Sequence, residues 1–126
     1  RNLNIILCVG ESYSTYKTKK SIQFIKSQLQ VLTKKTIKNT IIAYEPIWSI
    51  GTGIIPSEQY LNKTFDHLTQ YCKKKYSLKP KILYGGSVNE NNIKILKNIY
   101  NCSGFLIGGA SLKYKSFTNL IKNYYK

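Results

Sequence analysis

The sequence predicts an α/β protein with a parallel sheet, and three observations lead to that prediction. Four short runs rich in Ile, Leu or Val occur in the 126 residues, at 4–9, 40–44, 81–84 and 104–107. They do not alternate apolar with polar residues, which is typical of parallel strands buried on both faces. Segments with helical spacing separate the runs, and glycine follows each run closely. The pattern predicts four β-α units with right-handed crossovers, in one domain covering residues 1–126.

Four segments have the spacing of helices with one apolar face, because apolar residues recur at steps of three or four. The second of them starts at Pro56-Ser57-Glu58, which suits a helix N-terminus. The third is entered through asparagines at 89–92 that can act as caps. The apolar positions of the four expected helices are Ile22, Ile25, Leu29 and Leu32; Leu61, Phe65, Leu68 and Cys72; Ile93 and Leu96; and Phe117, Leu120, Ile121 and Tyr124.

The formal net charge of +15 is typical of nucleic-acid-binding modules, so this function has to be considered. However, Lys, Asn, Ile and Tyr, which all have A/T-rich codons, make up nearly half of the chain, so genome composition explains much of the lysine. The lysines are scattered, and arginine, the preferred reader of base edges, occurs once. We therefore favour a solvated basic surface and expect no nucleic-acid partner.

Cysteine and histidine content argues against a metal site or a disulfide framework. Cys8, Cys72 and Cys102 are odd in number and far apart, which fits a reducing, cytoplasmic location, and His67 is the single histidine. We expect no metal and no cofactor, and we expect Cys8 to be a buried strand residue that is not a nucleophile. No apolar stretch approaches ~20 residues, so no membrane span is expected. A start at Arg1 and the absence of methionine suggest a fragment.

Glycines mark the C-terminal end of every predicted strand. They are Gly10, Gly51 and Gly53, Gly85 and Gly86, and Gly108 and Gly109. Because the carboxyl ends of parallel strands meet at one edge, where ligands bind, functional residues are expected at 10–16, 45–53, 85–89 and 108–111. Within the first of these loops, Glu11 and Ser12 are expected to organise the loop rather than to perform chemistry.

Four motifs carry a resemblance to a known family. The stretch "AYEPIWSIGTG" (43–53) resembles the active-site signature of the triosephosphate isomerases. The stretches "CVGE" (8–11), "ILYGGSV" (82–88) and "GFLIGGASL" (104–112) resemble that family's fifth, seventh and eighth strand-to-loop junctions, in the same order. The resemblance covers essentially the whole chain. It implies the C-terminal half, strands five to eight, of a (β/α)8 TIM barrel.

The resemblance also implies a role for each site residue. Glu45 would be the base that moves a proton between adjacent carbons of a triose phosphate, in a site closed to water by a loop. The lid would be residues 47–53. Main-chain amides would bind the substrate phosphate at Gly51, Ser87, Gly108 and Gly109. The lid and the shielding of the base would involve Pro46, Trp48, Ile50, Thr52, Gly53 and Leu106.

The sequence departs from the family in two respects. Ile54 stands where many relatives have lysine after Gly-Thr-Gly. More importantly, no segment matches the lysine and histidine electrophiles or the dimer loop that the family carries in its N-terminal half. We therefore expect little isomerase activity from the chain alone, low stability in isolation, and a homodimer for the complete protein. A non-catalytic remnant or scaffold half-barrel is the alternative reading.

Overall fold

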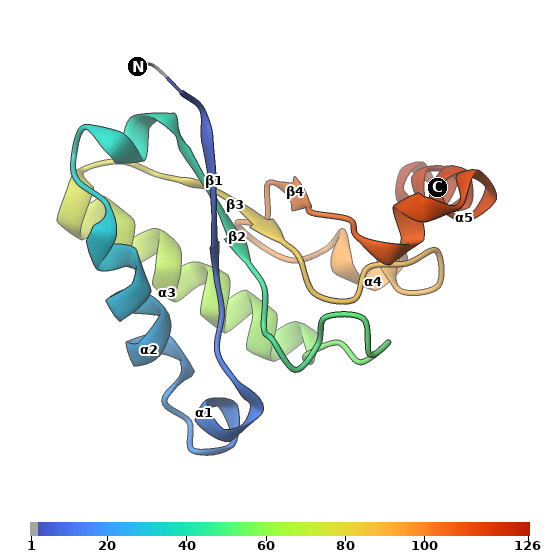
Figure 1. Cartoon of the computed structure of the whole chain (residues 1–126), viewed down its shortest axis with the longest axis horizontal. Helices are drawn as coiled ribbons and strands as arrows, with labels where there is room; N and C mark the ends of the chain where they lie inside the picture. Colours follow the sequence, from blue (N-terminus) through green and yellow to red (C-terminus); the bar gives the residue numbers. More distant parts are fainter. Residues whose placement is uncertain (1–2) are drawn as a thin grey trace.

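In the computed structural model, which describes residues 3–126, four parallel strands form one sheet in chain order (Figure 1). This confirms the predicted α/β class with four β-α units. Three of the four strands match the predicted runs to within one residue. The strands are β1 (Ile5–Val9), β2 (Thr40–Tyr44), β3 (Lys81–Tyr84) and β4 (Gly104–Phe105).

Five α-helices connect and follow the strands. They are α1 (Tyr13–Lys17), α2 (Ser21–Gln28), α3 (Glu58–Tyr76), α4 (Ile93–Leu96) and α5 (Tyr114–Tyr125). Ser57 caps α3 as expected, since its hydroxyl accepts a hydrogen bond from the Tyr60 N–H at 3.2 Å. The short helix α1 was not predicted. Its five residues are too few to show an apolar period, and it is started by the Ser12 side chain, which accepts from the Thr15 N–H.

The register of the strands sorts their side chains into two faces. Val9, Tyr44 and Tyr84 lie in one row across β1, β2 and β3, and Ile42 and Ile82 lie in the next row on the same face. All five are buried in one apolar cluster with residues of α2, α3, α4 and α5. The core of the protein therefore lies between this face of the sheet and the helices.

The opposite face of the sheet is only partly covered within residues 3–126. The strand pattern is typical of burial on both faces, and four strands of an eight-stranded barrel are expected to leave one face open in this way. Ile6 points to this face and is 49% exposed, although it lies within β1. Cys8 is exposed too, which corrects the prediction that it is buried. The sheet also has two free edges, at β1 and β4. Apolar side chains on an uncovered sheet face are sites of association.

Strand β4 is shorter than the predicted run 104–107. Within residues 3–126 it pairs with β3 alone, and no described strand lies along its second edge. The Leu106 N–H still donates to the Tyr84 carbonyl at 2.9 Å, so the chain continues along β3 for one residue beyond the strand. This extension brings Leu106 to the carboxyl edge of the sheet.

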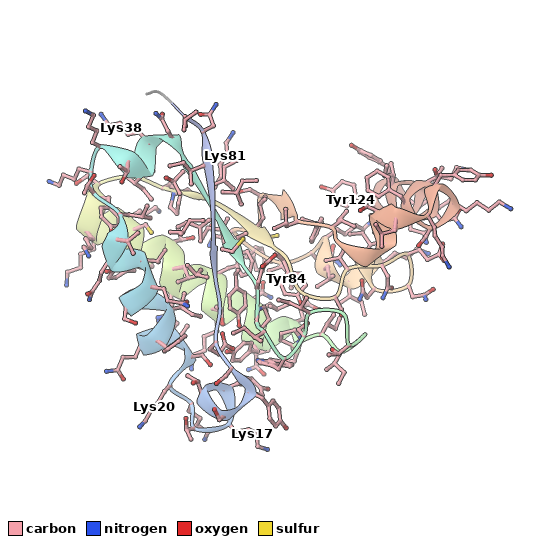
Figure 2. The ribbon with its side chains drawn as sticks, in the orientation of Figure 1. Lys17, Lys20, Lys38, Lys81, Tyr84 and Tyr124 are labelled. Atoms are coloured by element: carbon pink, nitrogen blue, oxygen red, sulfur yellow. The ribbon has the colours of Figure 1, made fainter. Side chains whose placement is uncertain are left out.

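The lysines are spread over the surface rather than gathered on one face. Figure 2 shows Lys17 and Lys20 at one end of the molecule and Lys38 and Lys81 at the other. Across residues 3–126, no helix combines the length and the apolar character needed to cross a membrane.

The two faces of the sheet should differ sharply in their contribution to stability. Ile42 is fully buried, so Ile42→Ala should lower the free energy of unfolding by about 2–5 kcal/mol. Ile6→Ala, the matched control on the exposed face, should change it by about 0.5 kcal/mol or less. Urea denaturation followed by circular dichroism measures both. Equal losses would contradict the assignment of the core to one face.

Candidate active site

A cavity of about 520 Å³ lies at the carboxyl edge of the sheet. Its walls come from the segments that follow β2, β3 and β4, which is the edge where the glycine clusters were expected to meet. Eight of the eleven predicted site residues line it. They are Glu45, Ile50, Gly51, Gly53, Ser87, Leu106, Gly108 and Gly109.

Glu45 is held at the end of β2 by its own backbone and by two neighbouring glycines. Its N–H donates to the Val9 carbonyl at 2.8 Å. A side chain at Gly10 would collide with the Glu45 carbonyl. A Cβ at Gly85 would lie 2.5 Å from the Glu45 Oε1 atom, so the carboxylate occupies space that only glycine leaves open. The role of Gly85 is not readable from the sequence, because a Gly-Gly pair after a strand also suits an ordinary turn.

Four other glycines of the cavity have open space where a side chain would stand, whereas Gly86 is packed against Tyr84 and Ser49. A Cβ built at Gly51, Gly53, Gly108 or Gly109 would meet no atom within 4 Å. Gly51 and Gly53 have φ of +70° and +78°, values that favour glycine. Gly109 begins a 3-10 helix, Gly109–Leu112. Main-chain N–H groups in such open positions can approach an anion closely.

Ser87 lies in the cavity wall, but its polar atoms are bonded to the lid. Its hydroxyl donates to the Ser49 carbonyl at 2.5 Å and accepts from the Gly53 N–H at 2.9 Å. Its N–H donates to the Ser49 hydroxyl at 3.2 Å. A phosphate that takes the Ser87 N–H would therefore replace or share a bond with the lid.

Ser49 is a lid residue that the sequence did not single out. It is fully buried, and its hydroxyl contacts the Tyr84 hydroxyl at 3.0 Å and the Ile54 carbonyl at 2.5 Å. Together with the Ser87 contacts, these bonds fasten the lid to the end of β3. A hydroxyl at this position could have been noticed in the sequence, but two of its partners, Tyr84 and Ser87, are more than thirty residues away.

The start of the lid is fastened by Glu11, in agreement with its expected role in organising the loop. The Glu11 Oε1 atom accepts hydrogen bonds from Tyr44, Trp48 and Tyr60 at 3.1, 3.3 and 3.1 Å. Burial, and then the charge of Glu11, raise the pKa of Tyr44. The Trp48 ring also lies 4.5 Å from the Tyr16 ring, centroid to centroid. These contacts connect the lid to β2 and α3.

Three of the predicted lid and shielding residues do not line the cavity. Pro46, which follows Glu45 in the chain, is buried, and its carbonyl accepts a hydrogen bond from the Ser49 N–H at 2.8 Å. Trp48 packs on aromatic side chains outside the cavity. The Thr52 hydroxyl donates to the carbonyls of Trp48 and Ser49, so it stabilises the turn of the lid.

Cys8 lies beside Glu45 on the uncovered face of the sheet. Partial burial of the thiol, followed by the charge of Glu45, raises the pKa of Cys8, so the thiol stays protonated near neutral pH. A protonated thiol is a poor nucleophile. In residues 3–126, no three His, Cys, Asp or Glu side chains gather in a way that could bind a metal ion.

Comparison with known proteins identifies the family. The family model for triosephosphate isomerase matches residues 1–124. The chain belongs to the triosephosphate isomerase family. Triosephosphate isomerases from Campylobacter jejuni subsp. doylei and Ureaplasma parvum are 43% and 42% identical to it over 118 residues. These alignments cover 94% and 93% of the chain and 50% of each relative. The Yarrowia lipolytica triosephosphate isomerase is 39% identical over 126 residues, which is 96% of the chain and 51% of the relative.

The chain thus spans about half the length of the curated relatives that it matches. This comparison corrects the prediction that the chain is the C-terminal half, with strands five to eight. The family match begins at residue 1 and continues to residue 124, and the half-length coverage of the relatives does not uphold that placement. Membership of the triosephosphate isomerase family does not depend on it.

Ser49→Ala should loosen the lid while leaving the sheet intact. The variant leaves the buried Tyr84 hydroxyl without this partner, a cost of roughly 1–3 kcal/mol that falls on the lid contact. Trp48 is the single tryptophan, so its fluorescence and its quenching by acrylamide report on the lid directly. We expect stronger quenching in Ser49→Ala than in the wild type. Ser27→Ala, at an exposed helical position, is the matched control, and equal quenching in both variants would contradict the Ser49 contact.

Tyr84 should make stability depend on alkaline pH. Burial raises its pKa from 10 to about 12, against an opposing hydrogen bond from Ser49. The folded state keeps the Tyr84 proton in this window while the unfolded chain loses it, so this contribution is complete below pH 10 and is lost as pH rises to about 12. Urea denaturation of wild type and Tyr84→Phe across the window measures the difference in stability. That difference should shrink with rising pH, and a constant difference would count against the raised pKa.

Proposed function

We propose that this chain provides the base, the lid and the phosphate-binding backbone of a triosephosphate isomerase. The reaction would interconvert dihydroxyacetone phosphate and D-glyceraldehyde 3-phosphate through an enediolate. The observation that carries the proposal is the cavity in which Glu45, Gly51, Ser87 and Gly109 meet. These groups come from three different strand ends, so their convergence is a property of the fold.

Glu45 would take a proton from the carbon beside the carbonyl and return it to the neighbouring carbon. Triosephosphate isomerases are a standard case of a glutamate base beneath a loop that excludes water. Ile50 and Leu106 line the same cavity and supply the apolar surroundings. In the present arrangement Ile50 is 48% exposed, so shielding by this residue requires further closure or a covering chain.

The phosphate dianion would be bound by backbone N–H groups of Gly51, Ser87, Gly108 and Gly109. The open backbone at these glycines favours a bulky anion, and the 3-10 turn at Gly109 directs N–H groups toward it. Binding at Ser87 would compete with its bond to Ser49, so substrate entry would reorganise the lid. A lid that exchanges internal bonds for ligand bonds can follow substrate binding with little net cost.

The carbonyl of the substrate needs a cationic or hydrogen-bonding electrophile, and the cavity does not provide a cationic one. Among the described residues that line it, none is Lys, Arg or His. Loss of a main electrophilic stabiliser typically costs about 10²–10³ in turnover. We therefore propose that the rest of the barrel supplies this group and covers the exposed face of β1 and β2. The complete enzyme would be a cytoplasmic homodimer, a location that agrees with the three free cysteines.

Complementation tests the proposal. The chain would be co-expressed with the half of the Campylobacter jejuni relative that the alignment leaves unmatched, and the purified complex would be assayed with D-glyceraldehyde 3-phosphate. We expect almost no turnover from the chain alone and measurable turnover from the complex. Glu45→Gln in the complex should lower turnover by about 10²–10⁴-fold. Gly85→Ala should lower it by about 10²-fold, because the added methyl group displaces the base.

Glu58→Gln is the matched control, since this exposed carboxylate lies in the first turn of α3 and away from the cavity. Its turnover should equal that of the unmodified complex. An assembled complex without turnover would favour the alternative of a non-catalytic scaffold. Turnover by the chain alone at the rate of the complex would refute the need for a second segment.

A further inference from the structure

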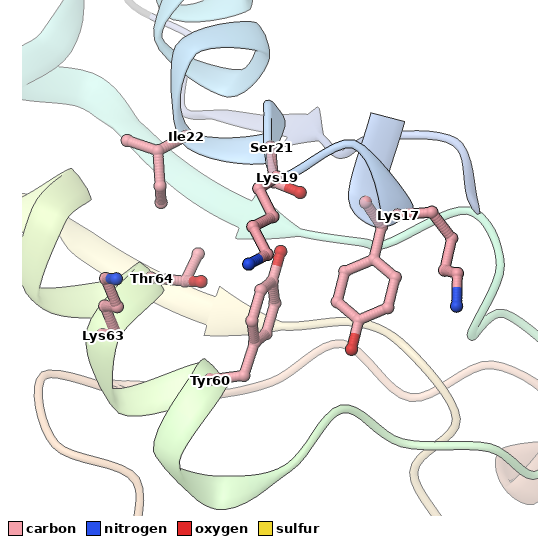
Figure 3. Close-up of a pocket in the computed structure, with 8 residues that line it drawn as sticks. Lys17, Lys19, Ser21, Ile22, Tyr60, Lys63 and Thr64 are labelled. Carbon is pink, nitrogen blue, oxygen red and sulfur yellow. The ribbon is translucent and has the colours of Figure 1, made fainter. Parts of the chain in front are cut away.

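We propose that a second cavity binds the phosphate group of a small phosphate monoester. This cavity, called the lysine cavity here, has a volume of about 500 Å³ and is lined by residues of α1, α2 and α3 and of the turn between α1 and α2 (Figure 3). It shares no lining residue with the cavity that contains Glu45. The inference concerns a separate ligand and does not depend on isomerase activity.

The first support is charge. Lys17, Lys19 and Lys63 line the lysine cavity, and no acidic residue does. Scattered lysines are ordinary in a chain with net charge +15, so charge by itself would not carry the proposal. Here, however, lysines from the turn before α2 and from α3 are directed to the same cavity. Lysine ammonium groups act as flexible point charges that bind phosphate well.

The second support is the N-terminus of α2, which begins at Ser21. The N-cap residue Lys20 makes no side-chain cap hydrogen bond, and the first turn contains no acidic residue. The first N–H groups of a helix lack intrahelical partners and carry a partial positive charge. An anion in the lysine cavity would accept hydrogen bonds from these N–H groups and would balance the partial positive charge at this end of α2.

The third support is an unsatisfied hydroxyl. Ser21 is only 4% exposed and lines the lysine cavity, and its Oγ atom has no hydrogen-bond partner among the described residues. Buried hydroxyls are normally paired, so an unpaired one calls for a partner. Burial raises the pKa of Tyr60 and its interaction with the Ser21 hydroxyl lowers it, so the Ser21 hydroxyl lies near the Tyr60 oxygen without reaching hydrogen-bond geometry. Tyr60 donates its own hydrogen to Glu11, however, at 3.1 Å.

The side chains in question point toward a common space. In Figure 3, Lys19 and Tyr60 extend toward each other with Ser21 beside them, whereas Lys17 extends toward the outside. Lys19 and Ser21 are therefore the best-placed ligands on one side of the lysine cavity, and Lys63 approaches from α3. A phosphate between them could accept bonds from two ammonium groups and one hydroxyl.

The size of the lysine cavity favours an ester over inorganic phosphate. A volume near 500 Å³ is in the range of small-molecule sites and leaves room beyond the phosphate group. The rings of Tyr16 and Tyr60 both line the lysine cavity, with centroids 5.1 Å apart and planes at 81°. This aromatic wall can pack against the organic part of the ligand.

Amide-resolved titration tests the site. The ¹⁵N-labelled chain would be titrated with inorganic phosphate and, separately, with phenyl phosphate. Both probes should shift the backbone amide signals of Ser21 and Ile22 in a saturable manner, and phenyl phosphate should bind more tightly. The amide signals of Gly108 and Gly109 report on the cavity that contains Glu45. If those signals do not shift, the proposed function fails, but the test of the lysine cavity is unaffected.

The double variant Lys19→Gln/Lys63→Gln should weaken binding at Ser21 and Ile22 by about tenfold or more, because it removes two charged donors. Ser21→Ala should weaken it by a smaller factor. The control Lys38→Gln/Lys81→Gln removes the same charge at the opposite end of the molecule and should leave binding unchanged (Figure 2).

Unmoved Ser21 and Ile22 signals, or equal losses in both double variants, would overturn the proposal. Equal binding of the two probes would overturn the assignment to an ester.

Discussion

The parallel register of β1, β2 and β3 is the constraint on which the rest of the structure depends. It aligns Val9, Tyr44 and Tyr84 in one row, so the chain leaves all three strands at the same level. Glu45 directly follows this row, and its N–H continues the ladder to the Val9 carbonyl. A shift of one residue in any strand would turn its side chains to the other face and move the loop that follows. The relative positions of Glu45, residues 47–53 and the glycine loops are thus set by backbone hydrogen bonds.

Two buried polar groups connect this frame to the lid. Glu11 gathers donors from β2, the lid and α3 on a single carboxylate oxygen. Ser49 connects the other side of the lid to β3 and the loop after it. Burying polar groups is costly unless they are hydrogen-bonded, so these contacts favour one arrangement of the lid over loosely packed alternatives. The Glu11 Oε2 atom remains without a partner among the described residues, which makes this end the less fully satisfied of the two.

Helices of the chain cover one face of the sheet and leave the other partly exposed, which explains why Cys8 is exposed although its apolar run predicts burial. Apolar runs such as 4–9 have the composition of strands covered on both faces. An apolar residue in the sequence predicts burial, but it does not show whether the covering segment belongs to the same chain. Within this chain the helices cover one face only, and Ile6 and Cys8 stay exposed on the other. The same limitation applies to β4, which lacks a neighbour on its second edge and is shorter than its apolar run.

The sequence by itself determined the α/β class, the order of the strands and the family, because apolar periodicity, glycine positions and the motif around Glu45 are local in the chain. It also located the carboxyl edge as the place of the site. Only the tertiary structure decided that Gly85 makes room for the Glu45 carboxylate, that Ser49 fastens residues 47–53 to β3, and that Ser21 is buried without a hydrogen-bond partner among the described residues. Each of these facts is a contact or an absence of contact between segments distant in the chain, and local patterns carry no information about distances of that kind.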